Sequence, residues 1–350
     1  MQADETPELK NQTAIKEFIL LGFRHLQNMK IILLLVFFLI YIMTMAGNVL
    51  IVVLVVTDRH LHTPMYFFLG NLSCLESLYT SAILPRMLAS FLTGDRTISV
   101  NGCFVQHYIF AYLAAVECYL LSAMSYDRYL AICKPLHYAS LMDGKLCLQM
   151  AAGSWVTGFL ASTTTIILMS RLVFCGPNEI DHFFCDTFPV MKLSCSNTVL
   201  LRILILIFVS IFTLPPFTLT LMSYVYIITA ILKIPSITGR QKAFSTCSSH
   251  LIVVTIFYGT IAAAYALPDS ATMGDVNKAF SVFYTIITPL VNPLIYSLRN
   301  KDVRASLQRS AVVAWVRTQV IDHKRGFCRM CKQTDRKKIR RETGSFHENH

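Results

Sequence analysis

Residues 31 to 57 read IILLLVFFLIYIMTMAGNVLIVVLVVT, a run of 27 residues that contains no charged side chain. An α-helix needs about 20 predominantly apolar residues to cross the hydrocarbon core of a bilayer. A helix on the surface of a soluble protein would interrupt such a run with a polar face. The stretch therefore predicts a membrane-spanning helix, and it identifies lipid as the solvent for the remaining sequence.

Six further apolar stretches are long enough to span a bilayer. Four contain no charge, namely 146–170, 203–232, 251–267 and 279–298, while 64–92 contains Glu76 and Arg86, and 103–125 contains Glu117. Only 15% of the 350 residues are charged, whereas a soluble chain carries about 25%. We expect an all-α membrane protein, with a seven-transmembrane helix bundle over residues 31–298 that follows an extracellular segment 1–30.

The distribution of charge predicts the orientation of the bundle. If the N-terminus lies outside, the segments on the inner side carry a net charge of +13 and those on the outer side carry −1. Lys and Arg are enriched in cytoplasmic loops of membrane proteins. The pattern predicts a multi-pass protein of the plasma membrane with an extracellular N-terminus and a cytoplasmic C-terminus.

Most of the positive charge lies after the last span. Val303, Leu307, Ala311 and Trp315 recur every four residues, which predicts a short amphipathic helix on the membrane surface over residues 299–320. Residues 321–350 are polar and basic without periodicity, so we expect a disordered cytoplasmic tail beside the anionic leaflet of the bilayer. No basic patch is interleaved with aromatic residues, and nucleic acid is therefore not an expected partner.

Four of the eleven cysteines fall on the outer side in this topology. Cys103, Cys175, Cys185 and Cys195 would face an oxidising exterior, where disulfides persist. Four cysteines allow three pairings, and the residues alone do not choose among them. Asn11 begins the sequence Asn-Gln-Thr on the outer segment, so it is a predicted glycosylation site. No spacing of ligands predicts a metal or a cofactor.

The third span ends with Asp127, Arg128 and Tyr129. An acid and an arginine side by side at membrane depth neutralise each other until another group draws the arginine away. Such an ion pair has two stable arrangements, as the inner end of a receptor requires. Three residues alone would equally fit an ordinary ion pair at the membrane edge.

Longer motifs carry more information than those three residues. Residues 124–138 read MSYDRYLAICKPLHY, residues 61–73 read LHTPMYFFLGNLS, residues 242–251 read KAFSTCSSHL, and residues 289–300 read PLVNPLIYSLRN. With Gly47-Asn48 in the first span and Ser223-Tyr224 in the fifth, their order resembles that of the vertebrate olfactory receptors. That family belongs to the rhodopsin-like (class A) G-protein-coupled receptors. The resemblance covers roughly residues 15 to 310.

This resemblance implies a function and its partners. We expect an odorant receptor that binds small, mostly apolar volatile molecules in the outer half of the bundle and activates a stimulatory heterotrimeric G protein of the cyclic AMP pathway. The residues implied in coupling and switching are Asp127, Arg128, Tyr129, Tyr224, Asn292, Pro293 and Tyr296. The resemblance also implies disulfides between Cys103 and Cys185 and between Cys175 and Cys195.

The family's ligand cavity lies among spans three, five and six. The matching positions are Phe110, Ala111, Ala114, Ala115, Phe208, Val209, Phe212, Tyr258, Ile261, Ala262 and Tyr265. Nearly all are apolar and none is charged. A concavity of this composition suits a small neutral molecule rather than an amine.

Two carboxyl groups are predicted within the membrane. Glu76 stands where the family usually has aspartate, and alignment with Asn48 and Asn292 would bring it close to Glu117 at mid-membrane. Burying two carboxyls is costly unless they are protonated, paired or bound to a cation. The sequence leaves two interpretations open: a sodium or proton site, or two neutral, hydrogen-bonded glutamic acids.

Other functions are less well supported. A ligand-gated channel or transporter would need a selectivity filter, a ring of pore charges or paired broken helices, and the sequence has none of these. A membrane enzyme would need clustered catalytic groups, whereas His107, His182 and the intramembrane acids are scattered. The same type of receptor used as a chemosensor outside the olfactory epithelium would have the same sequence features.

Overall fold

The computed structural model describes residues 15–175, 177–266 and 274–309. The chain forms two compact units, residues 1–300 and 301–350, and each is described by itself. In the second unit residues 301–309 are helical. The rest of the expected amphipathic helix to residue 320, the basic tail 321–350 and the predicted glycosylation site at Asn11 lie outside the described residues.

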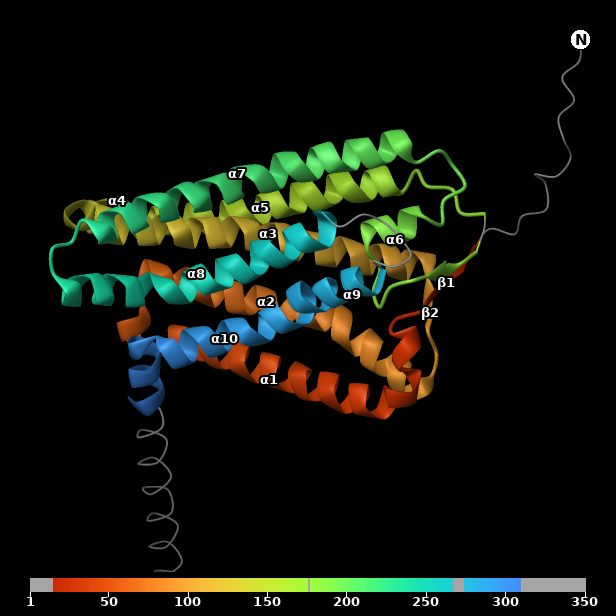
Figure 1. Cartoon of the computed structure of the whole chain (residues 1–350), viewed down its shortest axis with the longest axis horizontal. Coiled ribbons are helices and arrows are strands. Elements are labelled where there is room, and N and C mark those ends of the chain that lie inside the picture. Colours follow the sequence, from red (N-terminus) through yellow and green to blue (C-terminus); the bar gives the residue numbers. More distant parts are fainter. Residues whose placement is uncertain (1–14, 176, 267–273, 310–350) are drawn as a thin grey trace, which may run out of the picture. The chain divides into compact units, whose positions relative to one another are not determined.

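The first unit is a bundle of long helices (Figure 1). These are α1 (Lys30–Thr57), α2 (Pro64–Thr93), α3 (Val100–Cys133), α5 (Gly144–Met169), α7 (Val199–Leu232) and α8 (Ile237–Ala266). The last span joins α9 (Gly274–Val282), a π-helical turn η5 (Phe283–Ile287) and α10 (Thr288–Arg299). Within the described residues six helices meet the length and hydropathy of a membrane span, and α8, bent by 47°, makes the seventh. The predicted seven-transmembrane, all-α fold is confirmed.

Several helices extend beyond their apolar runs. The sixth span was expected from residue 251, yet α8 begins at Ile237, and α3 extends beyond the predicted run at both ends. A helix satisfies its backbone hydrogen bonds within itself, so it continues into water after its apolar side chains have ended. The hydropathy pattern therefore indicates where the bilayer lies rather than where a helix stops.

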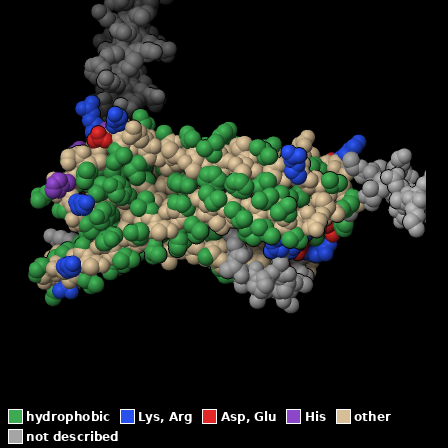
Figure 2. Space-filling model, turned by 90° about the horizontal axis from the view of Figure 1, so that it is seen from above, with side chains coloured by type: hydrophobic (Ala, Val, Ile, Leu, Met, Phe, Trp, Pro, Cys, Tyr) green, Lys and Arg blue, Asp and Glu red, His purple; other side chains and the backbone are tan. Residues whose placement is uncertain are grey.

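Hydrophobic side chains cover the outside of the bundle. Leu35 in α1 is 63% exposed and Val225 in α7 is 55% exposed. Figure 2 shows hydrophobic side chains spread over the middle of one face, with Lys and Arg side chains toward its ends. In water such a surface would be costly, whereas hydrocarbon solvates it, so this distribution agrees with lipid as the solvent.

Helix α3 is the central helix of the bundle. It packs against α2, α5, α7 and α8. The close approach of α5 depends on Gly158, where a Cβ atom would lie 2.5 Å from Val116 Cγ2 and 3.0 Å from the carbonyl oxygen of Tyr112. Small residues at such crossings allow helix backbones to pack closely in membranes.

A three-stranded sheet that includes the N-terminal strand lies at one end of the bundle; this end is named the outer end and the opposite one the inner end, after the expected orientation. Strand β1 (Glu17–Leu20) pairs antiparallel with β2 (Thr97–Ser99) and parallel with β3 (Glu179–Ile180). Phe18 of β1 is fully buried in a cluster with Cys103, Ile180 and Met191. The N-terminal segment is therefore packed onto the loops that follow α2 and α5.

Two disulfides hold this outer region. Cys103 at the start of α3 is bonded to Cys185, with the Cα atoms 5.5 Å apart. Cys175 is bonded to Cys195, with the Cα atoms 5.9 Å apart. In the segment that the second disulfide closes lies the short helix α6 (Thr187–Met191), whose N-terminus is capped by the Asp186 side chain. Burial raises the pKa of Asp186 to about 6.

Short elements connect the helices elsewhere. They are η2 (Arg24–Met29), η3 (Arg59–Leu61), η4 (Pro135–His137) and α4 (Tyr138–Leu141). Of these, η2 leads into α1 at the outer end, whereas the other three lie at the inner end of the bundle (Figure 1).

We expect Gly158→Ala to destabilise the bundle, because its added methyl group must displace Val116 or α3. Overpacking of this kind costs about 1–3 kcal/mol. Gly153→Ala is the matched control, since a Cβ atom at that exposed position of α5 meets nothing within 4 Å. Thermal unfolding of the purified receptor should show a lower midpoint for the first variant only, and equal midpoints would contradict this packing.

The disulfide between Cys103 and Cys185 should be required for delivery to the cell surface. We expect Cys103→Ser and Cys185→Ser each to abolish surface staining, and the double variant to be no worse, because the partners act through one bond. Cys74→Ser, at an exposed free cysteine, should stain normally. Flow cytometry measures all four variants, and a clearly larger loss in the double variant would contradict the pairing.

Candidate functional site

The inner end of α3 carries a buried ion pair. Arg128 donates from Nη2 and Nε to Asp127 Oδ2, at 2.6 and 3.0 Å. The Asp127 side chain is fully buried and that of Arg128 is 13% exposed. Two charges removed from water persist only as a well-bonded pair, so Arg128 is held until another group replaces its partner.

A third residue is hydrogen-bonded to this ion pair. Tyr138, the first residue of α4, donates its hydroxyl to Asp127 Oδ1 at 2.7 Å. Burial, followed by the neighbouring Asp127, raises the pKa of Tyr138, so its hydroxyl remains a donor at physiological pH. The motif run 124–138 includes Tyr138, but its role was missed because the contact depends on how the chain folds back after α3. Asp127, Arg128 and Tyr138 are named the inner latch.

Helices α7 and α8 meet beside this latch. A hydrogen bond of 2.6 Å joins Tyr224 Oη to His250 Nδ1, and both side chains are buried. Tyr224 also packs with Ile227, Ile231 and Cys247, and Tyr129 of α3 packs against the same cluster. His250 belongs to the run KAFSTCSSHL, yet its partner could be identified only from the packing of two helices.

Pro293 leaves one backbone carbonyl of α10 without its helical hydrogen-bond donor. Proline has no N–H, so the carbonyl of Pro289, four residues earlier, lacks its usual helical partner. Asn48 of α1 donates its Nδ2 to that carbonyl at 3.2 Å and to Thr44 O at 3.1 Å. Asn48, expected at the ion or proton site, and Pro293, an expected switch residue, are thus linked through one backbone carbonyl.

The two intramembrane glutamates are both buried, and one of them is hydrogen-bonded to Asn292. Asn292 donates its Nδ2 to Glu76 Oε1, and both Glu76 and Glu117 are almost fully buried. Glu76 Oε2 and Glu117 Oε1 have no hydrogen-bond partner among the described residues. A buried carboxyl oxygen without a hydrogen-bond partner is costly unless the group is protonated or bound to a cation. Either a proton or a cation would satisfy these two oxygens.

A further buried tyrosine and a second helix contact lie at the inner end of the last span. Tyr296 is 1% exposed. Tyr66, at the start of α2, donates its hydroxyl to Asn300 Oδ1 at 2.9 Å. Both members of this pair belong to motif runs, but no local pattern indicates that they are joined.

The expected ligand positions are distributed over three helices. Phe110 is buried, and its ring packs against Phe184 of the outer loop with centroids 4.8 Å apart. Tyr258 of α8 donates its hydroxyl to the carbonyl of Cys118 in α3 at 3.3 Å. The half-buried positions are Ala111, Ala114, Ala115, Phe208, Phe212, Tyr258 and Ile261. Val209 and Ala262 are exposed, and the side chain of Tyr265 lies outside the described residues.

Polar contacts join the outer loop to α9. His182 is hydrogen-bonded to Ser281 Oγ at 3.2 Å, and Lys278 donates its Nζ to Asp181 Oδ1 at 2.6 Å. Burial, followed by the positive charge of Lys278, lowers the pKa of His182 to about 3. A neutral His182 therefore links the loop to the last span, an arrangement that the sequence motifs did not indicate.

The described residues contain no group of three or more His, Cys, Asp or Glu side chains placed to hold a metal.

Comparison with known proteins identifies the family. Residues 37–313 match the family model of the olfactory receptors. The chain is 48% identical to human olfactory receptor 6N1 over 299 residues, which cover 85% of this chain and 96% of that receptor. It is 48% identical to human olfactory receptor 6B1, with 87% of this chain and 97% of that receptor covered. Human olfactory receptor 11L1 is 46% identical, with 88% and 97% covered.

Both the matched length and the identity extend over the whole helix bundle. The chain therefore belongs to the olfactory receptor family, whose members are odorant-binding G-protein-coupled receptors of the plasma membrane and not enzymes.

Proposed function

We propose that this receptor binds a small, neutral, mostly apolar odorant in the outer half of the bundle and activates a stimulatory G protein, which raises cyclic AMP. The inner latch is the observation that carries this proposal. It is a buried ion pair with one additional donor, and such a group favours one state of the bundle until the G protein or an agonist stabilises another.

The proposed ligand site lies between α3, α7 and α8. Three half-buried positions on α3, Ala111, Ala114 and Ala115, carry small side chains, which would leave room for a ligand. Phe208, Phe212 and Ile261 supply apolar walls, and the hydroxyl of Tyr258 supplies a polar group. A mostly apolar concavity with few polar groups favours a neutral ligand, since none of the proposed lining positions carries a carboxylate to pair with an amine.

The proposed orientation places the N-terminus outside. Its support is the positive charge of the segments at the latch end of the bundle, which cytoplasmic loops favour. The two disulfides lie at the other end, where an oxidising exterior would preserve them.

Activation would begin with release of Arg128. When Arg128 turns away from Asp127, it becomes available at the surface formed by α3, α7 and α8. The hydrogen bond between Tyr224 and His250 lies beside this surface, so a movement of α8 would alter it. An agonist needs only to bind the released arrangement more tightly to shift the equilibrium.

Glu76, Glu117, Asn292 and Asn48 are proposed as a proton or sodium site that stabilises the resting arrangement. Both carboxyls are buried, and each has an oxygen without a partner in the described part of the chain. A proton or cation there would link α2 and α3 with the last span, whose carbonyl at Pro289 already depends on Asn48.

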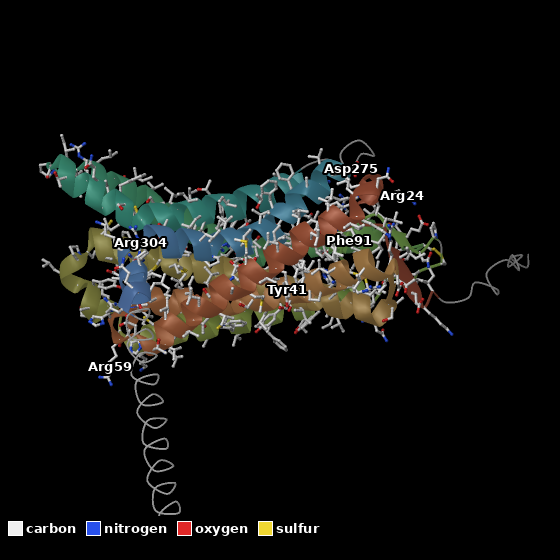
Figure 3. All side chains as sticks on the ribbon, turned by 90° about the horizontal axis from the view of Figure 1, so that it is seen from below. Arg24, Tyr41, Arg59, Phe91, Asp275 and Arg304 are labelled. Atoms are coloured by element: carbon white, nitrogen blue, oxygen red, sulfur yellow. A yellow bond between two sulfur atoms is a disulfide. The ribbon has the colours of Figure 1, made fainter. Side chains whose placement is uncertain are left out.

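Screening a panel of volatile molecules against cyclic AMP in cells tests the function. We expect an agonist among neutral apolar volatiles, and Arg128→Ala should lose the response at equal surface expression because the latch arginine is gone. Arg59→Ala, at an exposed arginine of the same end (Figure 3), is the control and should respond normally. Full signalling by Arg128→Ala would contradict the proposed role of the latch.

Tyr138→Phe should raise basal signalling without agonist. The variant removes one donor to the Asp127 carboxylate, and a hydrogen bond to a charged group contributes about 1.5–3 kcal/mol. Basal cyclic AMP should therefore rise several-fold relative to the amount of receptor at the surface. Tyr126→Phe, at the residue that precedes Asp127 in α3, should leave it unchanged. Unchanged basal activity in both variants would show that Tyr138 does not restrain the receptor.

A further inference from the structure

A buried histidine, His107, lies in the outer half of α3. It is 2% exposed, and neither of its ring nitrogens forms a hydrogen bond with any group of the described residues. A polar group that is buried without a partner raises the free energy of the folded state. This position therefore calls for a partner that the described protein atoms do not supply.

The preceding residue, Gln106, is also buried but is bonded at both ends of its amide. Its Nε2 donates to the carbonyl of Ala82 in α2 at 3.1 Å, and its Oε1 accepts from the N–H of Cys185 at 3.1 Å. Neighbouring polar side chains on α3 thus differ: Gln106 joins α3 to α2 and to the outer loop, whereas His107 has nothing comparable among the described residues.

The polar group beside the His107 ring is the backbone of Cys185. The N–H of Cys185 is already donated to Gln106, so the group that Cys185 offers to the ring is its carbonyl oxygen, an acceptor. A neutral imidazole has one N–H and one acceptor nitrogen. If a small shift lets the carbonyl accept the N–H, the second nitrogen still lacks a donor. The missing partner of His107 is therefore a hydrogen-bond donor.

His107 shares one face of α3 with proposed odorant positions. Residues 107, 111, 114 and 118 follow one another at the three- and four-residue spacing of a single helix face. Ala111 and Ala114 are small and half-buried, and the carbonyl of Cys118 accepts from the hydroxyl of Tyr258 in α8. At about 1.5 Å per residue, His107 lies about 10 Å above Ala114 along the helix. A polar ring thus stands at the outer end of an apolar strip.

The outer loop covers this end of the strip. Phe184 packs on Phe110 with ring centroids 4.8 Å apart, and Phe184 and Cys185 are both fully buried. The disulfide between Cys103 and Cys185 holds the loop against α3 at this point. A hydrogen bond made beneath the loop would be stronger than one in water, because the surroundings are apolar.

We propose that His107 is a specificity-determining residue that accepts a hydrogen bond from the hydroxyl of the odorant, so that this receptor selects apolar alcohols. The proposal rests on the odorant site between α3, α7 and α8 proposed above. The hydroxyl would lie at His107, and the hydrocarbon part would lie along Ala111 and Ala114.

Alcohols are selected because they supply the donor that the ring nitrogen lacks. The aldehyde and the methyl ether of the same carbon frame carry only acceptors. A site that bonds a hydroxyl rejects an analogue without one, since the polar group of the site is then left unpaired.

Straight-chain primary alcohols from hexanol to decanol, each compared with its aldehyde and its methyl ether, test this selection. The full-length receptor is assayed for cyclic AMP in cells and, after purification into nanodiscs, for stabilisation against thermal unfolding by each compound. We expect the most potent alcohol to act at a concentration at least about fivefold lower than its ether and its aldehyde, as one neutral hydrogen bond predicts. Equal potency of alcohol and ether, the result expected if a buried water satisfies His107, would overturn the proposal.

Substitutions at His107 test whether this residue is the source of the preference. His107→Phe keeps an aromatic ring without nitrogens, and it should bring the alcohol within about twofold of the ether while the response to the ether is retained. His107→Gln restores an acceptor oxygen and should recover part of the preference. Tyr108→Phe is the matched control, because it removes a hydroxyl from the next residue of α3, whose partner is Thr163 of α5.

Thermal unfolding without ligand shows which variants are folded, and His107→Leu replaces His107→Phe if the latter is not. An unchanged preference for alcohol in the folded apolar variant would overturn the role of His107. Loss of the preference in a folded Tyr108→Phe would do the same, because the preference would then not be specific to His107. The comparison of alcohol with ether on the wild type needs neither variant.

The two assays separate this inference from the proposed function. Arg128→Ala should lose the cyclic AMP response but keep the stabilisation by alcohols, because the inner latch lies at the other end of α3. Stabilisation of the wild type by alcohols without cyclic AMP would contradict the proposed coupling and support the role of His107. Ethers and aldehydes that act as strongly as alcohols, or a series in which no alcohol stabilises the receptor, would overturn the role of His107 and leave the proposed function to the wider panel of volatiles.

Discussion

The need to satisfy every backbone polar group within the protein governs this structure. Hydrocarbon offers no hydrogen bonds, so the chain crosses it only as helices. Pro293 shows the constraint at one atom, because it leaves the carbonyl of Pro289 without a helical donor and Asn48 of α1 supplies one. The same constraint joins α1 to the last span at Pro293, which is one of the proposed switch residues.

Polar groups are gathered inside the bundle for the same reason. Glu76, Glu117 and Asp127 are all buried, while aliphatic side chains such as Leu35 are exposed to lipid. Helix α3 passes through this interior, with Phe110 under the outer loop and Asp127 at the inner latch. One rigid helix therefore contributes to the proposed ligand site, the carboxyl pair and the latch, so a rearrangement at one level has a direct route to the others.

The two ends of the bundle are held by different interactions. The outer end has covalent bonds, a small sheet and stacked aromatic rings, which keep the N-terminal strand and the long loop together. The inner end has an ion pair, a tyrosine donor and a tyrosine–histidine hydrogen bond, all of which can exchange partners. This difference suits a receptor in which the outer region holds its shape around a ligand and the inner region changes.

The sequence by itself determined the seven spans, the family and the residues of the ion pair, because hydropathy and short motifs are local properties of the chain. It could not give the true start of α8 at Ile237, since helical hydrogen bonds continue where apolar side chains end. Only the tertiary structure decided that Tyr138 bonds Asp127, that Tyr224 meets His250 and that Tyr66 meets Asn300. The same holds for the strand pairing of residues 17–20. These features join residues far apart in the chain, and their geometry follows from helix packing, which no local pattern encodes.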